Sequence, residues 1–367
     1  MLNEVIKKKG YPDIAMLSTN ERLSKENHSL WRAEIIAKLE KYIYGKTPSS
    51  PDSVYLKSVE QNDELAYAGK VKEEHITIAF TTELGEFSFP ISLYIPKNVD
   101  TPPVLLHIAF RPAPDRYIPV EEITDGGFAL VVVVYTDLLN DIHFGDFSDG
   151  LGKYFKVDKD TRSPDTWGKI GMWAYGVSRV MDYIESRDDL DKKRVSVIGH
   201  SRLGKTALWC AAQDERFYAA ISNNSGYGGA RSSKCSTGEG IHDFLRLGSW
   251  AWFTESFKDY LGRENEKPYD QAELLGLIAP RPLLVNSAIE DTGADPIGEF
   301  LTTYNSSRVW ERLGVSGLIT PDSLPSAPSR LFDGRVGYFL RHGRHYLSRE
   351  DWGATMEFLN RKFKEDK

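Results

Sequence analysis

The segment RVSVIGHSRLGKTALW, residues 194–209, contains a serine in a setting suited to nucleophilic catalysis. A β-branched run precedes Ser201 and a helix-forming run follows it, so the serine falls at a sharp strand-to-helix turn. Such a turn lifts the hydroxyl out of the sheet, and the following helix N-terminus offers backbone N–H groups to an oxyanion. Gly199 keeps the first glycine of the G-x-S-x-G pattern, but Leu203 occupies the last position and Gly204 comes one residue late. The alternative is a Gly-Ser turn that only caps a helix.

A serine nucleophile needs a general base and an orienting carboxylate, which α/β-hydrolases supply in the chain order Ser, Asp or Glu, His. Asp291 follows the strand-like run PRPLLVNSA (280–288), where such enzymes commonly keep the acid. Its neighbours Glu290 and Asp295 are the alternatives. The histidines after the serine are His242, His342 and His345. His242 precedes the last predicted strands, whereas the other two follow the strand-like run VGYFLR (336–341), so the base is one of these two.

The elements that must position these residues alternate along the chain. Continuous apolar runs at 103–110 and 128–135 are typical of strands buried on both faces. Residues 166–187 show apolar side chains at helical spacing. This alternation predicts an α/β-hydrolase fold, a doubly wound, mostly parallel sheet sandwiched by helices in three layers. We expect a helical N-terminal arm over residues 1–60, packed on a catalytic domain over 61–367.

Composition narrows the classes of function. The chain has 367 residues, of which 41% are hydrophobic, and a net charge of −7, so a large core is possible and a basic nucleic-acid face is not expected. No apolar run approaches a membrane span, and the first residues lack the apolar core of a signal peptide. The two cysteines, Cys210 and Cys235, suggest neither a metal site nor a disulfide framework. We therefore expect a soluble protein with no metal and no membrane or nucleic-acid partner. A leader that had been removed would leave the same appearance, so the compartment stays open. We also expect a monomer that needs no cofactor, although the sequence does not determine the oligomeric state.

Further segments accompany the serine turn in a specific order. They read ISNNSGYGGA (221–230), WFTESFKDY (252–260), LLGLIAPRPLLVNSAIED (274–291) and GRH (343–345). With the elbow G-x-S-R-x-G, this set resembles the glucuronoyl esterases, family 15 of the carbohydrate esterases, in their bacterial branch. The resemblance runs from about residue 100 to the C-terminus and is loose over the first 90 residues.

The resemblance implies a serine esterase of the 4-O-methyl-glucuronoyl methylesterase type, acting on esters between xylan and lignin without a cofactor. It implies Ser201 as nucleophile and His345 rather than His342 as base. The family has a second position for the acid, and here Asn224 occupies it, so we predict Asp291 as the acid. It further implies that Arg202 supports the oxyanion, and it identifies three residues that contact the sugar, with Trp250 as a substitute for the last: Lys205, Glu239 and Trp252.

Two departures from the family pattern fall near the active-site rim. Gly293 stands where the family often has tryptophan, and the segment HIAFRPAPDR (107–116) replaces a loop rich in asparagine and glycine. These changes affect the expected substrate more than the expected chemistry. Two other functions therefore stay open: hydrolysis of acetyl or other small esters on the same fold, and carbohydrate binding by a catalytically idle relative.

Overall fold

The computed structural model describes residues 1–141, 145–234 and 237–366. Its described strands form one ten-stranded sheet in the order β1-β2-β3-β5-β4-β6-β7-β8-β10-β9. Pairing is parallel from β5 through β4, β6, β7 and β8 to β10, and antiparallel at both ends of the sheet. The strands are β1 (Ser53–Ala66), β2 (Val71–Thr82), β3 (Gly85–Pro96), β4 (Pro103–Ala109), β5 (Ala129–Val134), β6 (Asp191–His200), β7 (Ala219–Asn223), β8 (Leu283–Ala288), β9 (Ser329–Leu331) and β10 (Val336–Arg341).

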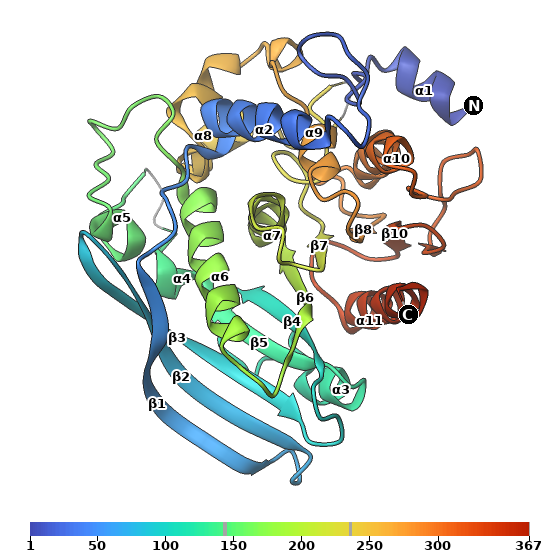
Figure 1. Cartoon of the computed structure of the whole chain (residues 1–367). Coiled ribbons are helices and arrows are strands. Elements are labelled where there is room, and N and C mark those ends of the chain that lie inside the picture. The colour runs from blue at the N-terminus through green and yellow to red at the C-terminus, as the bar shows by residue number, and fades with distance from the viewer. Residues whose placement is uncertain (142–144, 235–236, 367) are drawn as a thin grey trace.

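Helices cover both faces of the parallel part of the sheet (Figure 1). One face packs against α6 (Lys169–Glu185), α7 (Arg202–Gln213), α9 (Gln271–Gly276) and α10 (Pro296–Arg312), and the other against α3 (Val120–Asp125) and α11 (Arg349–Glu365). The remaining helical elements are α1 (Leu2–Lys8), α2 (His28–Leu39), η1 (Glu40–Tyr44), α4 (Tyr135–Leu138), α5 (Gly150–Tyr154), α8 (Ile241–Arg246), η2 (Ser249–Trp252), η3 (Glu255–Tyr260) and η4 (Glu264–Glu266). Among the helices that the structure describes, none combines the length and the apolar character needed to cross a bilayer.

The core explains why the central strands are mostly apolar. In β4, Val104 and Leu106 join the cluster beneath α6 and α7, while Leu105 between them joins the cluster beneath α3 and α11. Successive side chains of a strand face opposite ways, so a strand covered on both faces needs apolar residues at every position. The predicted three-layer, mostly parallel α/β fold is confirmed.

The N-terminal segment packs closely on the main body. The Tyr44 ring at the end of η1 stacks on Trp209 of α7, with centroids 4.6 Å apart, and its hydroxyl donates to the Gly228 carbonyl at 2.9 Å. Strand β1 was not among the predicted elements, and it crosses the predicted boundary at residue 60. Its side chains are mostly exposed, so it lacks the apolar pattern by which the other strands were recognised.

Strand β1 is also the edge of the sheet, and it carries features that discourage pairing with other chains. Its register against β2 shifts at three places. Lys57 forms an ion pair with Glu86 of β3 at 2.5 Å. Irregular register and charge are common protections of an exposed edge.

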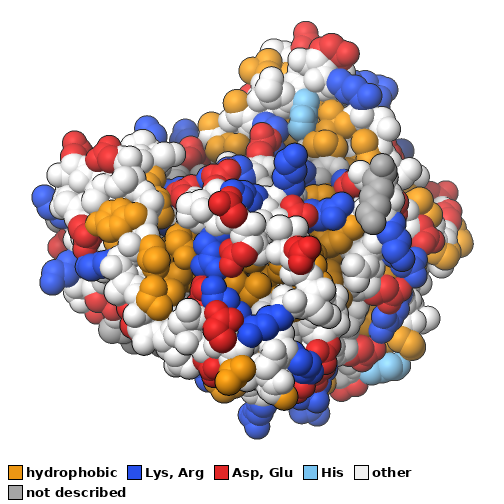
Figure 2. All heavy atoms as spheres, turned by 60° about the horizontal axis from the view of Figure 1, so that its bottom comes forward, with side chains coloured by type: hydrophobic (Ala, Val, Ile, Leu, Met, Phe, Trp, Pro, Cys, Tyr) orange, Lys and Arg blue, Asp and Glu red, His pale blue; other side chains and the backbone are white. Residues whose placement is uncertain are grey.

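Acidic and basic side chains are interspersed over the face of the molecule that Figure 2 shows.

We propose that the arm and the catalytic domain unfold as one unit, and Tyr44→Ala tests this. Removing the fully buried Tyr44 ring should lower the free energy of unfolding of the whole chain by about 3–5 kcal/mol in a single transition. Chemical denaturation followed by tryptophan fluorescence and by circular dichroism measures it. Leu65→Ala, at a side chain that is 76% exposed, is the control and should change stability little. Two separate transitions, with only the first displaced, would contradict the proposal.

Candidate active site

Ser201 lies at the turn between β6 and α7, with backbone angles φ 58° and ψ −128°. A positive φ is strained for a residue with a side chain and persists only where the surrounding structure holds it. Here the backbone N–H of Ser201 donates to the carbonyl of Asn223, the last residue of β7, at 2.9 Å. In the first turn of α7, the N–H groups of Gly204 and Lys205 donate to the Ser201 carbonyl at 2.9 and 3.1 Å. The two N–H groups before them, of Arg202 and Leu203, precede the first intrahelical bond. The turn thus offers a hydroxyl beside unpaired helix donors, as the sequence predicted.

Close packing explains the altered glycine spacing of the motif. A Cβ on Gly199 would lie 2.1 Å from the carbonyl oxygen of Leu203, so no larger residue fits there. A Cβ on Gly204 would lie 3.1 Å from the Cβ of Ser225, where α7 passes the loop after β7. The Leu203 side chain is fully buried. A glycine at 204 therefore avoids a tight contact with this loop, and Leu203 packs into the core at the position where the motif usually has glycine.

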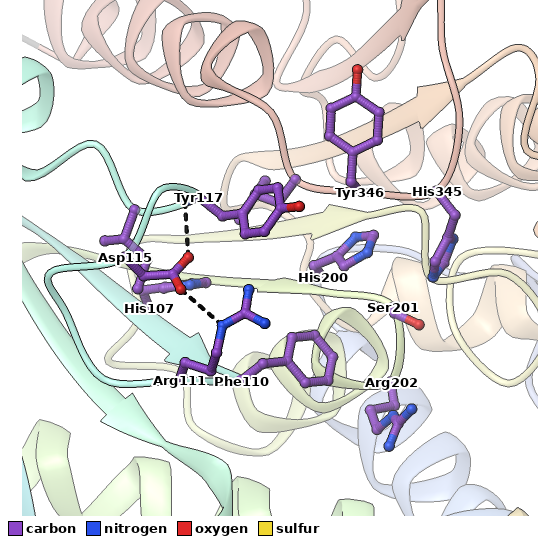
Figure 3. Close-up of a pocket in the computed structure, with 12 residues that line it drawn as sticks. His107, Phe110, Arg111, Asp115, Tyr117, His200, Ser201, Arg202, His345 and Tyr346 are labelled. Carbon is purple, nitrogen blue, oxygen red and sulfur yellow. Dashed lines mark hydrogen bonds and ion pairs between the residues drawn. The ribbon is translucent and has the colours of Figure 1, made fainter.

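His345 lies in the loop after β10, and its ring extends toward Ser201 (Figure 3). Its Nδ1 is 2.6 Å from Oδ2 of Asp291, which lies in the loop after the neighbouring strand β8. The Asp291 side chain is only 7% exposed, whereas that of His345 is 44% exposed. Because a carboxylate can only accept, Nδ1 carries the proton, and Nε2 of the neutral ring is left with a free lone pair. This is the tautomer that a general base requires.

Asp291 receives a second hydrogen bond from the residue at the family's other acid position. Nδ2 of Asn224 donates to Oδ2 of Asp291 at 2.7 Å. Burial by itself raises the pKa of Asp291, but the hydrogen bonds from His345 and Asn224 outweigh it, and the pKa lies below its ordinary value. Asn224 therefore acts on the acid as a donor and helps to keep it ionised.

The alternative acids have other partners. Oε1 of Glu290 accepts from the backbone N–H of Gly343 at 3.2 Å, and its side chain is 54% exposed. Asp295 is the N-cap of α10 and accepts from the N–H of Gly298 at 2.9 Å. Among the described residues, neither carboxylate forms a hydrogen bond or ion pair with His345. Asp291 is thus the member of this group that meets the predicted base.

The other histidines after the serine are exposed, His242 on α8 and His342 at the start of the β10 loop. His200, which directly precedes the serine, had no role predicted from sequence. Its ring centroid is 4.5 Å from that of His345, and its Nδ1 is 2.6 Å from Oδ1 of Asn223. Burial lowers the pKa of His200 to about 3, so this ring is neutral. Its position inside the G-x-S motif was the feature of the sequence that could have indicated a place in the site.

A buried ion pair fixes the loop that carries His345. Arg341, the last residue of β10, binds both carboxylate oxygens of Asp351 through Nε, at 2.8 and 2.9 Å. Its two terminal nitrogens donate to the loop carbonyls of His342 at 2.9 Å, Arg344 at 3.3 Å and Tyr346. Both side chains of the pair are at most 1% exposed. The guanidinium thus satisfies backbone groups on either side of the histidine.

A cavity of about 370 Å³ opens beside the serine (Figure 3). Three predicted site residues line it, Ser201, Arg202 and His345, and Asp291 lies behind the histidine. Much of the wall comes from the divergent segment after β4 and from the loop after β10. The lining residues are His107, Phe110, Arg111, Asp115, Tyr117, Ile118, His200, Ser201, Arg202, His345, Tyr346 and Leu347.

The predicted sugar-contacting residues lie near one another but outside the lining of this cavity. Nζ of Lys205 donates to the Ser225 carbonyl at 2.6 Å and lies 3.3 Å from Oε1 of Glu239. Burial lowers the pKa of Lys205, and Glu239 partly opposes that shift. The Trp252 ring centroid is 4.5 Å from the Arg202 guanidinium carbon and 6.0 Å from Nζ of Lys205. Trp250, the substitute, packs instead against Lys258 at 3.9 Å.

Gly293 and the two cysteines complete the positions singled out from the sequence. The backbone of Gly293, where the family often has tryptophan, accepts from the N–H of Glu239 at 3.0 Å. Cys210 is a buried free thiol, and Cys235 lies outside the described residues. Within the described ranges, no cluster of three or more metal-ligating side chains occurs.

Comparison with known proteins relates the chain to esterases. Residues 78–314 match a family model described as glucuronyl esterase of fungi. The chain is 31% identical to carbohydrate esterase MZ0003 of an unknown prokaryotic organism, over 95% of this chain and 88% of that protein. The match to a 4-O-methyl-glucuronoyl methylesterase of Podospora anserina is 27% identical and spans 81% of this chain and 58% of the fungal protein.

Solved structures agree with these relationships. A glucuronoyl esterase from Solibacter usitatus superposes with a TM-score of 0.86 at 32% identity, over 95% of this chain and 96% of that one. A promiscuous CE15 esterase from a marine bacterial metagenome gives a TM-score of 0.83 at 29% identity, over the same shares of both chains.

The acid can be tested by replacing the carboxylate and the amide separately. Asp291→Asn should lower kcat by about ten-thousand-fold, because the imidazolium loses its counter-charge and the tautomer is no longer fixed. Asn224→Ala removes one hydrogen bond and should cost about tenfold, since a hydrogen bond to a charged group contributes about 1.5–3 kcal/mol. Glu290→Gln is the exposed control and should leave kcat near the parent value. A severe Asn224→Ala with a mild Asp291→Asn would show that Asp291 is not the acid.

Proposed function

Because the chain belongs to the glucuronoyl esterase family, we propose that it is a serine esterase that hydrolyses esters of 4-O-methylglucuronic acid. The family resemblance predicted from the elbow and its companion segments is confirmed. The single observation that carries the proposed chemistry is the 2.6 Å contact between His345 and Asp291, on the loop that faces the Ser201 elbow. The natural substrate we propose is a glucuronoxylan-linked ester, and the predicted monomer stays a prediction.

The proposed reaction follows the serine hydrolase sequence. Oγ of Ser201 attacks the ester carbonyl while Nε2 of His345 takes its proton. The oxyanion that forms is stabilised by donors at the N-terminus of α7 and by the Arg202 guanidinium. When the ester C–O bond breaks, His345 returns the proton to the departing alcohol. Water then attacks the acyl carbonyl while His345 takes its proton, the bond to Oγ of Ser201 breaks, and His345 returns the proton to that oxygen. The products are the free uronic acid and the alcohol.

The positions of Lys205 and Glu239 support a sugar as the acyl part. Lys205 lies one helical turn after Ser201 and is buried, and Oε1 of Glu239 lies 3.3 Å from its Nζ. Buried polar groups that a substrate can pair with discriminate against substrates that lack the partner. Ring hydroxyls of a uronate offer such partners, whereas an acetyl group offers none.

A second candidate is hydrolysis of acetyl or other small esters at the same residues. The cavity beside Ser201 favours it, because it is lined by Phe110, Tyr117 and Leu347 and does not depend on the sugar-contacting residues. The 29% identical marine relative is itself described as promiscuous. The third alternative, an idle binding protein, is disfavoured by the intact hydrogen bond between base and acid.

Turnover of benzyl glucuronate beside 4-nitrophenyl acetate, for the parent and for Ser201→Ala, tests the proposal. We expect a clear preference of the parent for the glucuronate ester, and loss of both activities in the folded variant, because no other group can form the acyl-enzyme. Circular dichroism checks the fold. Near-parental turnover by folded Ser201→Ala would contradict a serine mechanism, and a parent active only on the acetate would favour the second candidate.

Lys205→Ala separates the two substrates. It should lower kcat/KM for the glucuronate ester by about 10- to 100-fold, equivalent to about 1.4–2.8 kcal/mol. Its effect on the acetate ester should be small, because acetate has no hydroxyl for the lysine. Arg202→Ala is the matched comparison and should harm both reactions, since both form the same oxyanion. Equal losses in Lys205→Ala would indicate that the lysine only anchors the Ser225 carbonyl.

A further inference from the structure

Asp141, a residue with no role predicted from sequence, lies in the loop after β5 and α4. Its side chain is 6% exposed. An ionised carboxylate that is buried to this degree is unfavourable unless charged or polar partners surround it. Each of the two carboxylate oxygens of Asp141 has such a partner.

The two partners come from distant parts of the chain. Oδ2 of Asp141 forms an ion pair and hydrogen bond with Nη1 of Arg202, and Oδ1 accepts from Nε1 of Trp252 at 2.7 Å. One side chain therefore joins the residue after the nucleophile to an aromatic residue of η2. Both partners are residues that the sequence predicted to bind the ester.

The Arg202 guanidinium is held from several directions by this arrangement. Its carbon lies 4.5 Å from the centroid of the Trp252 ring and 5.5 Å from that of Phe110. Nη1 is occupied by Asp141, while Nε is buried without a hydrogen-bond partner among the described residues. A buried donor without an acceptor costs about 1–3 kcal/mol, so its retention calls for a use. Arg202 lines the cavity beside Ser201, where the ester oxygens must lie during attack.

We infer that Asp141 is a positioning residue for ester hydrolysis: it fixes the plane of the Arg202 guanidinium so that the donors it leaves free serve the reacting ester. The inference rests on the proposed function only for the choice of substrate. Two opposite effects of the carboxylate compete. Its negative charge weakens the attraction between Arg202 and an oxyanion, but its hydrogen bond orients the guanidinium. Orientation outweighs charge here, because preorganised donors act at their full strength only when they need not be rearranged during the reaction.

The test is a double-mutant cycle with Asp141→Asn, Arg202→Ala and the pair together, assayed on benzyl glucuronate, or on whichever ester the parent hydrolyses. Asp141→Asn keeps the shape but removes the charge. It should lower kcat by about 10- to 100-fold and change KM by less than about threefold, since an interaction specific to the transition state affects kcat. In the Arg202→Ala background the same change should cost less than about twofold, because the group it orients is gone. Asp137→Asn, at an exposed carboxylate of α4, is the matched control and should match the parent.

Several results would overturn the inference. The first is a double variant in which the kcat losses of the two single changes multiply. The second is a folded Asp141→Asn whose kcat lies within about twofold of the parent value. The third is a higher kcat in Asp141→Asn, which would mean that the charge of Asp141 matters more than its orienting effect. If Asp141→Asn does not fold, Trp252→Phe assayed on an acetate ester decides the question. It removes the indole hydrogen bond to Asp141 and keeps an aromatic ring beside Arg202, while acetate has no sugar for that ring to contact. A loss in kcat of about threefold or more then supports the inference, and a parental kcat overturns it. A parent inactive on every glucuronate ester but active on an acetate overturns the proposed function alone.

Discussion

The hydrogen bond between Nδ1 of His345 and the carboxylate of Asp291 is the constraint on which the candidate site depends. Two loops, after β8 and after β10, must hold these atoms 2.6 Å apart while the histidine stays partly exposed. Each side of the contact has its own support. Asn224 donates to the carboxylate, and Arg341 donates to the carbonyls of Arg344 and Tyr346 on the two sides of the histidine. Asn224 and Arg341 are more deeply buried than His345. The substrate can therefore reach the histidine ring while these residues hold its loop in place.

The sheet explains why residues so far apart in sequence meet. Strands β6, β8 and β10 run parallel, so their carboxyl ends lie at one edge of the sheet. Ser201, Asp291 and His345 follow those three ends in turn. The strand between β6 and β8 is β7, and the loop after it contributes Asn224 to the acid and the Ser225 carbonyl to Lys205. In a parallel sheet a polar loop at each strand end is the ordinary place for a site.

The parts of this arrangement that depend on local pattern were predictable from sequence. Apolar runs and helical spacing predicted the layers, and the strand-serine-helix order predicted the elbow, because these signals are carried by adjacent residues. Strand β1 was missed, since an exposed edge strand has no buried face to impose a pattern. The partners Asp141 and His200 were missed for a different reason. Their significance lies in contacts across 61 and 145 residues of chain, with Arg202 and His345, which no local pattern encodes.

The two sides of Ser201 differ in how their charges are held, and this difference bears on the chemistry. Arg202, Lys205 and Asp141 are paired and largely withdrawn from water, whereas Arg111 on the cavity side is 57% exposed beside Asp115. Charges interact far more strongly where water is excluded, so the buried set can act on an oxyanion or a bound hydroxyl, while the exposed pair contributes little. Desolvating those charges is costly, and their mutual pairing offsets only part of the cost. A polar acyl group that forms hydrogen bonds with these charged side chains offsets more of the desolvation cost than an apolar group does. For the proposed reaction, these charges support a hydroxylated acyl group near Lys205. We propose the cavity lined by Phe110 and Tyr117 as the place of the departing alcohol.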